Sequence, residues 1–92
     1  MNLKDLRDGI KKRYYELDRR SGELFLLAVL FEEAGELAEA VRKGIKDDVE
    51  EELADLLFMV LSLANLFNVE PERVLVEKYL KRDPSERWDL PR

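Results

Sequence analysis

Apolar residues recur every three or four positions along four stretches of the chain, a period that is typical of amphipathic helices. We expect helices over about residues 3–20, 23–43, 49–67 and 71–82. Glycines mark the first two breaks, with Gly22 after the first stretch and Gly44 after the second. Asp48 is the expected cap of the third helix, and Pro71 occupies a favourable first position in the fourth. The polar tail that follows is expected to be irregular.

This pattern predicts an all-α fold, a four-helix bundle in which residues 1–92 form a single domain. The third helix has apolar residues right around its surface rather than on one face. These positions are Leu56, Leu57, Phe58, Met59, Val60, Leu61 and Leu63. A chain this short buries only about 60% of its unfolded surface, which leaves too little protein to cover such a helix. We therefore expect a homodimer or a homotetramer.

The composition narrows the possible functions. Charged residues make up 40% of the chain, the net charge is −5, and there is no histidine or cysteine. The missing side chains exclude catalysis by histidine and zinc sites built from histidine or cysteine. A negative net charge argues against a nucleic-acid partner, which needs a basic surface. No apolar run reaches the roughly 20 residues of a membrane span, so we expect no membrane partner and a cytoplasmic protein.

Two acidic pairs stand where the helical period places apolar residues. Glu33 falls on the apolar stripe of the second helix, and Glu36 flanks the same stripe one turn later. Glu52 and Asp55 are in line with apolar residues of the third helix. Either pair alone is more often part of a solvated helix face. Together, two pairs on apolar stripes point to a site.

The two pairs are placed symmetrically about Gly44. Glu33 and Asp55 are each 11 residues from it, and Glu36 and Glu52 are each 8 residues away. If the second and third helices form an antiparallel hairpin, residues equidistant from the turn face each other and the four carboxylates converge. Such carboxylates repel and lose hydration, and no Lys or Arg shares their inward positions. A divalent cation that prefers oxygen ligands, Mg²⁺ or Mn²⁺, relieves both effects.

In these residues the chain resembles the MazG-like nucleotide pyrophosphohydrolases, an all-α superfamily. The family pattern, Glu-Glu-x-x-Glu and then Glu-x-x-Asp, stands here as EEAGE at residues 32–36 and EELAD at residues 51–55. The resemblance covers about residues 24–88. It implies four Mg²⁺ ligands, Glu33, Glu36, Glu52 and Asp55. It also implies that water splits a nucleoside triphosphate into a monophosphate and pyrophosphate, with Glu33 or Glu36 accepting the water's proton.

The resemblance also implies contacts to the substrate. The family tends to place basic phosphate contacts in the fourth helix and tail, where this chain has Lys78, Arg82 and Arg87. Each of these is equally well explained as an ordinary surface charge. Asn65 interrupts an apolar helix at a position that resembles the family's LAN sequence. There it either contacts the substrate or satisfies a backbone group.

Two other functions fit part of the sequence. Phosphoribosyl-ATP pyrophosphohydrolase is a near relative with the same fold and metal chemistry, but that branch commonly has a histidine after the Asp of the third helix. This chain has no histidine. The second alternative is a non-catalytic helical module for oligomerisation or regulation. Such a module has no reason to keep four inward carboxylates, so we expect hydrolysis of nucleoside triphosphates.

Overall fold

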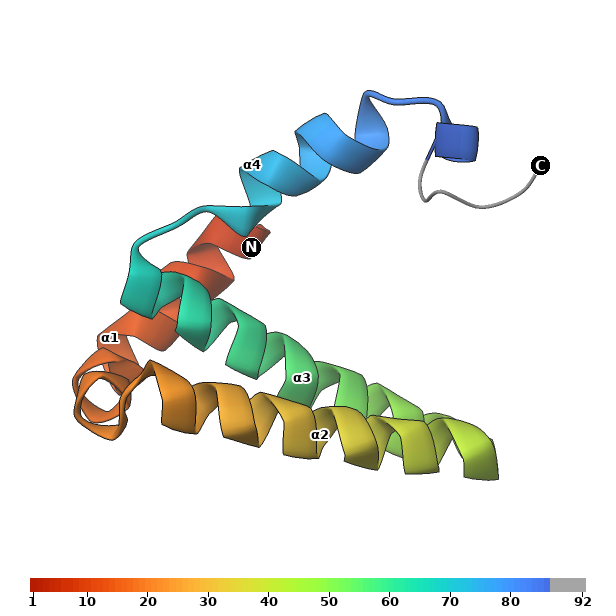
Figure 1. The fold of residues 1–92 in the computed structure, drawn as a ribbon, viewed down its shortest axis with the longest axis horizontal. Helices are drawn as coiled ribbons and strands as arrows, with labels where there is room; N and C mark the ends of the chain where they lie inside the picture. The colour runs from red at the N-terminus through yellow and green to blue at the C-terminus, as the bar shows by residue number, and fades with distance from the viewer. Residues whose placement is uncertain (87–92) are drawn as a thin grey trace.

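The structure is a computed structural model of the chain and describes residues 1–86 (Figure 1). Its elements are α1 (Leu3–Ser21), α2 (Glu23–Lys43), α3 (Lys46–Phe67), α4 (Pro71–Leu75), the π-helical turn η1 (Val76–Leu80) and the 3₁₀ turn η2 (Pro84–Glu86). No strand occurs among the described residues. The expected all-α fold is therefore confirmed.

The ends of the first two helices follow their local sequence. α1 opens with a capping box, in which Asn2 Oδ1 accepts from the Asp5 amide at 2.9 Å and Asp5 Oδ2 accepts from the Asn2 amide at 3.2 Å. α2 ends at Gly44, whose φ of 71° lies in the left-handed region that glycine adopts without strain. The tight turn at Gly44 sends the chain back along α2.

The start of α3 corrects one expectation. Asp48 does not cap this helix, because α3 already begins at Lys46 with Ile45 in the N-cap position. Asp47 and Asp48 lie in its first turn, where the positive end of the helix dipole stabilises carboxylates. The acidic residues therefore favour the helix start from inside it, and no side-chain cap is present.

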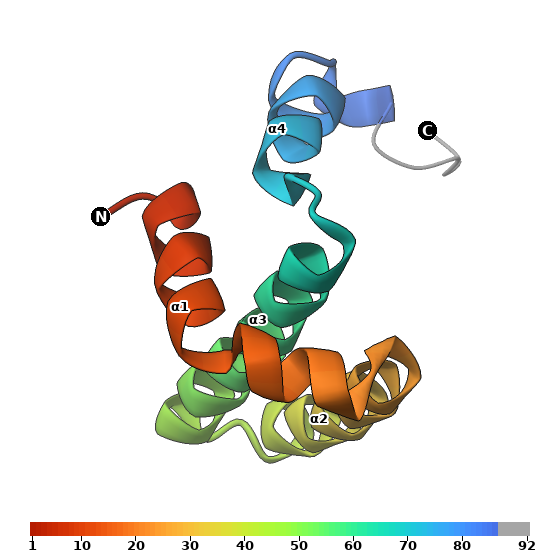
Figure 2. The same ribbon diagram turned by 90° about the vertical axis from the view of Figure 1, so that its left-hand side faces the viewer.

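α2 and α3 form an antiparallel hairpin, and α1 crosses its open end (Figures 1 and 2). The buried apolar side chains come from the two hairpin helices and are Leu26, Ala40, Met59, Leu61 and Ala64. Tyr14 of α1 packs edge-to-face against Phe58 of α3, with 5.0 Å between the ring centroids. The core therefore fixes the two helices that carry the acidic pairs.

The arm, which we define as residues 71–80 of α4 and η1, leaves α3 across a bend of 111° and stands apart from the hairpin (Figure 1). It ends as a π-helical turn at Leu80, two residues before Arg82, where the fourth helix was expected to end. No single described helix is long and apolar enough to cross a membrane. α3 and the arm meet those criteria only when they are counted together across the bend.

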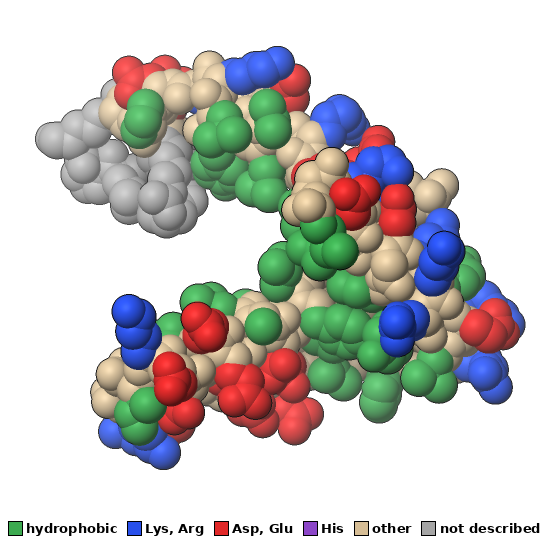
Figure 3. All heavy atoms as spheres, turned by 180° about the vertical axis from the view of Figure 1, so that it is seen from behind, with side chains coloured by type: hydrophobic (Ala, Val, Ile, Leu, Met, Phe, Trp, Pro, Cys, Tyr) green, Lys and Arg blue, Asp and Glu red, His purple; other side chains and the backbone are tan. Residues whose placement is uncertain are grey.

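This open arrangement leaves much apolar surface uncovered. Met59 and Leu61 of α3 are buried, but Leu57 and Val60 on its other side remain exposed. Seen from behind, apolar side chains line both sides of the opening between the arm and the hairpin (Figure 3). The exposed large apolar residues of α2 and the arm include Leu24, Phe25, Phe31, Val74, Leu75 and Leu80. Residues 1–86 of one chain thus leave α3 only partly covered.

Candidate metal centre

The hairpin brings three of the four predicted carboxylates to one point. Glu33 and Glu36 project from α2 and Glu52 from α3. One carboxylate oxygen from each lies within 4.8 Å of the other two. The cause is local: residues three apart share a helix face, and the turn at Gly44 sets the register of the facing helix. We call Glu33, Glu36 and Glu52 the acidic cluster.

Burial and mutual repulsion both act on the acidic cluster. The Glu33 and Glu52 side chains are half-buried, whereas Glu36 is exposed. Loss of hydration, followed by the nearby negative charge of Glu36, raises the pKa of Glu33 and of Glu52. The Oε2 atoms of Glu33 and Glu52 are buried and have no hydrogen-bond donor among residues 1–86. Two oxygens therefore lack the positive or donating partner that buried carboxylates require.

Asp55 lies one turn along α3 from Glu52, but its side chain is exposed and its oxygens fall outside the 4.8 Å set. Its negative charge still contributes to the raised pKa values of Glu33 and Glu52. It is therefore close enough to act on the acidic cluster through space. Direct ligation by Asp55 stays a prediction.

The acidic cluster suits a hard divalent cation. Its donor atoms are all carboxylate oxygens, the ligands that Mg²⁺ and Mn²⁺ prefer. A bound cation would give the two unpartnered oxygens a positive neighbour and would remove the repulsion between the three side chains. The described residues supply no such partner, since none of the observed ion pairs involves Glu33, Glu36 or Glu52. The residues present therefore fit the metal that the sequence predicts.

A cavity of about 240 Å³ adjoins the acidic cluster, between the cluster and the residues near the hairpin turn. Glu36 and Glu52 form part of its wall, and the remaining lining residues are Glu39, Ala40, Lys43 and Asp48. The side chains of Glu39 and Lys43 are about half exposed, and Lys43 Nζ lies 3.7 Å from Glu39 Oε1. Neither residue was predicted to border the acidic cluster, although both follow Glu36 at helical spacing.

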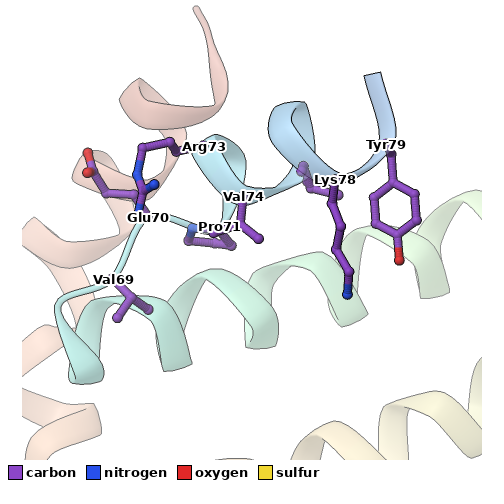
Figure 4. A pocket seen from close by; sticks show the side chains of 8 residues that line it. Val69, Glu70, Pro71, Arg73, Val74, Lys78 and Tyr79 are labelled. Atoms are coloured by element: carbon purple, nitrogen blue, oxygen red, sulfur yellow. The ribbon is translucent and has the colours of Figure 1, made fainter. Parts of the chain in front are cut away.

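The residues predicted to contact phosphate lie elsewhere. Lys78 lines a groove of about 480 Å³ on the arm, together with Tyr79, Val74 and five neighbours (Figure 4). In that view Lys78 and Tyr79 project from the arm on the side where α3 lies. Arg82 is exposed beyond the end of η1, and Arg87 lies outside the described residues. The groove and the cavity beside the acidic cluster have no lining residue in common.

Asn65 is buried between α1 and α3, with 4% of its surface exposed. Its Nδ2 donates to the backbone carbonyl of Arg7 at 3.0 Å. This contact is the second of the two roles considered for Asn65, the satisfaction of a backbone group. Its Oδ1 is buried without a donor among the described residues. A contact between Asn65 and a substrate stays a prediction.

An antiparallel helical hairpin that presents carboxylates from both helices to one point defines an all-α domain with a candidate divalent-metal site. Residues 21–86 match the MazG nucleotide pyrophosphohydrolase domain, and the chain belongs to this family. The family resemblance seen in the sequence is thereby confirmed. The chain is also similar to the uncharacterized protein YpjD of Bacillus subtilis (strain 168), with 34% identity over 94 residues. That alignment covers 79% of this chain and 84% of YpjD.

Proposed function

We propose that the protein is a Mg²⁺-dependent nucleoside triphosphate pyrophosphohydrolase, with Mn²⁺ as a possible substitute for Mg²⁺. It would convert a nucleoside or deoxynucleoside triphosphate and water to the monophosphate and pyrophosphate. The observation that carries the proposal is the acidic cluster: three carboxylates from two helices within 4.8 Å, two of them with buried oxygens that lack a partner. Membership of the MazG family supports the same class of reaction.

Glu33, Glu36 and Glu52 would hold the cation, with Asp55 as a fourth ligand or as a nearby negative charge. When bound, a divalent cation supplies positive charge to phosphate oxygens and lowers the pKa of coordinated water. The half-buried Glu33 and Glu52 would fix the cation on the hairpin, because each offers a buried oxygen that has no other partner among residues 1–86. The ligands of the cation would therefore come from both α2 and α3. A change in the register of the hairpin would separate them and lower activity.

Proton transfer falls to Glu33 or Glu36, and we propose Glu36. Its side chain is exposed whereas those of Glu33 and Glu52 are half-buried, so solvent water reaches Glu36 most freely. In the reaction the water oxygen forms a bond to the α phosphorus. The bond between the α phosphorus and the oxygen that bridges the α and β phosphates then breaks. The proton lost by the water passes to a Glu36 carboxylate oxygen, and pyrophosphate leaves.

The triphosphate also needs cations from the protein. We propose Lys78, Arg82 and Arg87 for this role, and Asn65 as a further substrate contact. Since the groove around Lys78 is separate from the acidic cluster, we propose that a homodimer or homotetramer brings basic and acidic residues together. The exposed apolar surface beside both regions is consistent with such an assembly. The cytoplasm remains the compartment that we expect.

A pyrophosphate-release assay tests the proposal. The wild-type protein is incubated with normal and modified nucleoside triphosphates, and with phosphoribosyl-ATP, in the presence of Mg²⁺ or of a chelator. We expect Mg²⁺-dependent release from at least one triphosphate. Glu36→Gln should lower kcat by about 100-fold or more, as expected when a general base is lost. Glu23→Gln, at an exposed position on the same helix outside the family motif, is the matched control and should retain activity.

Absence of pyrophosphate release from every triphosphate would reject the enzymatic proposal and favour the non-catalytic alternative. Release from phosphoribosyl-ATP alone would favour the related enzyme. Full activity of Glu36→Gln would leave the reaction class intact but reject this residue as the proton acceptor.

A further inference from the structure

Arg7 is the one charged residue among residues 1–86 that is buried, with 8% of its surface exposed. Its Nη2 lies 2.7 Å from Glu72 Oε2 and 3.8 Å from Glu70 Oε1. The Arg7 and Glu72 side chains are only 10% and 23% exposed, so solvent screens their attraction less than it screens surface pairs. The other ion pairs among the described residues join exposed side chains that are three or four residues apart in sequence.

The partners of Arg7 stand at the base of the arm. Glu70 precedes α4 and Glu72 lies in its first turn. Between residues 71 and 86, Pro71 and Glu72 are half-buried and all other side chains are exposed. The arm thus meets the rest of the described chain mainly at its base, and the Arg7–Glu72 pair is the shorter of the two ion pairs there.

The backbone of Arg7 is itself held by α3. Asn65 donates to the Arg7 backbone carbonyl at 3.0 Å and ties this turn of α1 to the buried end of α3. Asn65 and the Arg7 guanidinium therefore link α3, α1 and the arm in one continuous contact. The bend of 111° between α3 and the arm is spanned by this link. Removing the charge would leave the turn at residues 68–70 as the main constraint on the angle.

We infer that Arg7 is a positioning residue, which sets the direction of the arm through Glu72 and thereby places Lys78 for the substrate. The role assigned to Lys78 rests on the proposed function, whereas the effect of Arg7 on the arm does not. Arg7 itself stays away from the reacting atoms. A small rotation of the arm at its base moves the residues near its far end by the largest distance. Loss of the Arg7–Glu72 contact therefore displaces Lys78 and Tyr79 more than residues at the base.

A distance measurement tests the effect on the arm. The chain has no cysteine, so Lys46→Cys on the hairpin and Glu77→Cys on the arm introduce two unique sites for spin labels. Dilution with unlabelled protein restricts the signal to distances within one chain. We expect one narrow distribution with Arg7 present. Arg7→Met should make it roughly twice as broad, because the arm then has few stabilising contacts.

Two further variants make the result specific. Glu72→Gln keeps Arg7 and its longer contact with Glu70, and it should broaden the distribution nearly as much as Arg7→Met does. Combining the two changes should add little to Arg7→Met alone, since both remove the Arg7–Glu72 pair. Arg13→Met is the matched control, because Arg13 is an exposed arginine of α1 with no ion pair in the described part of the chain. It should leave the distribution unchanged. Circular dichroism establishes that each variant is folded.

Kinetics test the consequence for the substrate. We expect Arg7→Met and Glu72→Gln to raise KM for the triphosphate by about tenfold and to change kcat by less than about threefold, the pattern of lost substrate binding. Distributions as narrow as that of the wild type in both variants would overturn the inference, and so would broadened distributions with an unchanged KM. The distances need no substrate, so a failure of the proposed hydrolysis would be recognised separately.

Discussion

Glu33 and Glu52 each hold a buried oxygen that no donor among residues 1–86 contacts. For carboxylates whose folded-state pKa is raised, the charged form is disfavoured by folding. The protonated carboxyls of Glu33 and Glu52 therefore stabilise the folded state relative to the ionised ones. This stabilisation is fully present below the pKa of the unfolded chain and is lost as the pH rises through the raised folded-state pKa. The acidic cluster is a local source of instability at neutral pH unless a cation neutralises it.

The raised pKa of Glu52 predicts how stability depends on pH. Between about pH 4 and pH 7, the free energy of unfolding of the metal-free wild type should fall relative to that of Glu52→Gln, because only the wild type must ionise that site. Urea denaturation at several pH values measures the difference. Glu50→Gln, an exposed position on the same helix, should follow the wild type.

Mg²⁺ should reverse the effect at neutral pH. At 100 times its Kd, a ligand that binds only the folded state adds about 2.7 kcal/mol of stability. Glu52→Gln should lose most of this gain and Glu50→Gln should keep it. An equal response of all three proteins to Mg²⁺ would remove Glu52 from the metal site.

Asn65 allows its two roles to be separated. Asn65→Ala removes the donor to the buried Arg7 carbonyl, so it should cost about 1 to 3 kcal/mol of stability. If that hydrogen bond is its whole role, KM for the triphosphate should change little at temperatures where the variant is fully folded. Unchanged stability combined with a raised KM would instead identify Asn65 as a substrate contact. Chemical denaturation and steady-state kinetics on the same preparation give both numbers.

At the scale of elements, the helices could be predicted but the angles between them could not. The spacing of apolar residues located all four helices, because a helix face is defined by near neighbours in sequence. The prediction that Asp48 caps α3 was wrong, because an aspartate stabilises a helix both as its cap and within its first turn. The bend before the arm depends on Arg7 meeting Glu72, a contact 65 residues apart in sequence.

Arg7 illustrates what the sequence contained and what it lacked. Leu3, Arg7, Ile10 and Tyr14 follow a three-or-four spacing, so Arg7 falls on the apolar face of α1. That signal indicated a buried or edge position. It could not indicate which of the chain's many acidic residues would be the partner.

Substitution by alanine should change stability in opposite directions at Gly44, in the turn after α2, and at Gly9, within α1. Gly44→Ala places a Cβ in open space but at a φ of 71°, so backbone strain alone should cost about 1 kcal/mol. Gly9→Ala lies within α1, also in open space, and should add about 0.5 to 1 kcal/mol because alanine favours the helix. Thermal or urea denaturation of the pair measures both changes. A stabilising Gly44→Ala would contradict the left-handed turn.

For the whole molecule, both the acidic cluster and the exposed apolar surface concern the assembly of chains. The acidic cluster could be predicted from sequence because Glu33, Glu36 and Glu52 are related by a simple hairpin. The position of the basic residues could not, since the arm stands apart and Arg87 lies outside the described residues. An assembly of chains is the arrangement we propose to join them.

Light scattering with size-exclusion chromatography tests this assembly. We expect the mass of a dimer or tetramer at micromolar concentration, because Leu24, Phe31 and Leu80 are each more than 60% exposed in one chain. Replacing Phe31 with serine should shift the protein toward the monomer if this surface is the contact. A monomeric wild type across the micromolar range would contradict the proposal.

We propose above all that the hairpin carboxylates direct Mg²⁺-dependent cleavage between the α and β phosphates. Phosphorus-31 NMR of a triphosphate incubated with the wild-type protein and Mg²⁺ tests it most directly, because it identifies both products. We expect resonances of monophosphate and pyrophosphate that grow together in the presence of Mg²⁺, and we expect neither with a chelator or with the Glu33→Gln/Glu52→Gln variant. Formation of nucleoside diphosphate and orthophosphate would contradict this proposal. Equal cleavage by the wild type and by that variant would also contradict it.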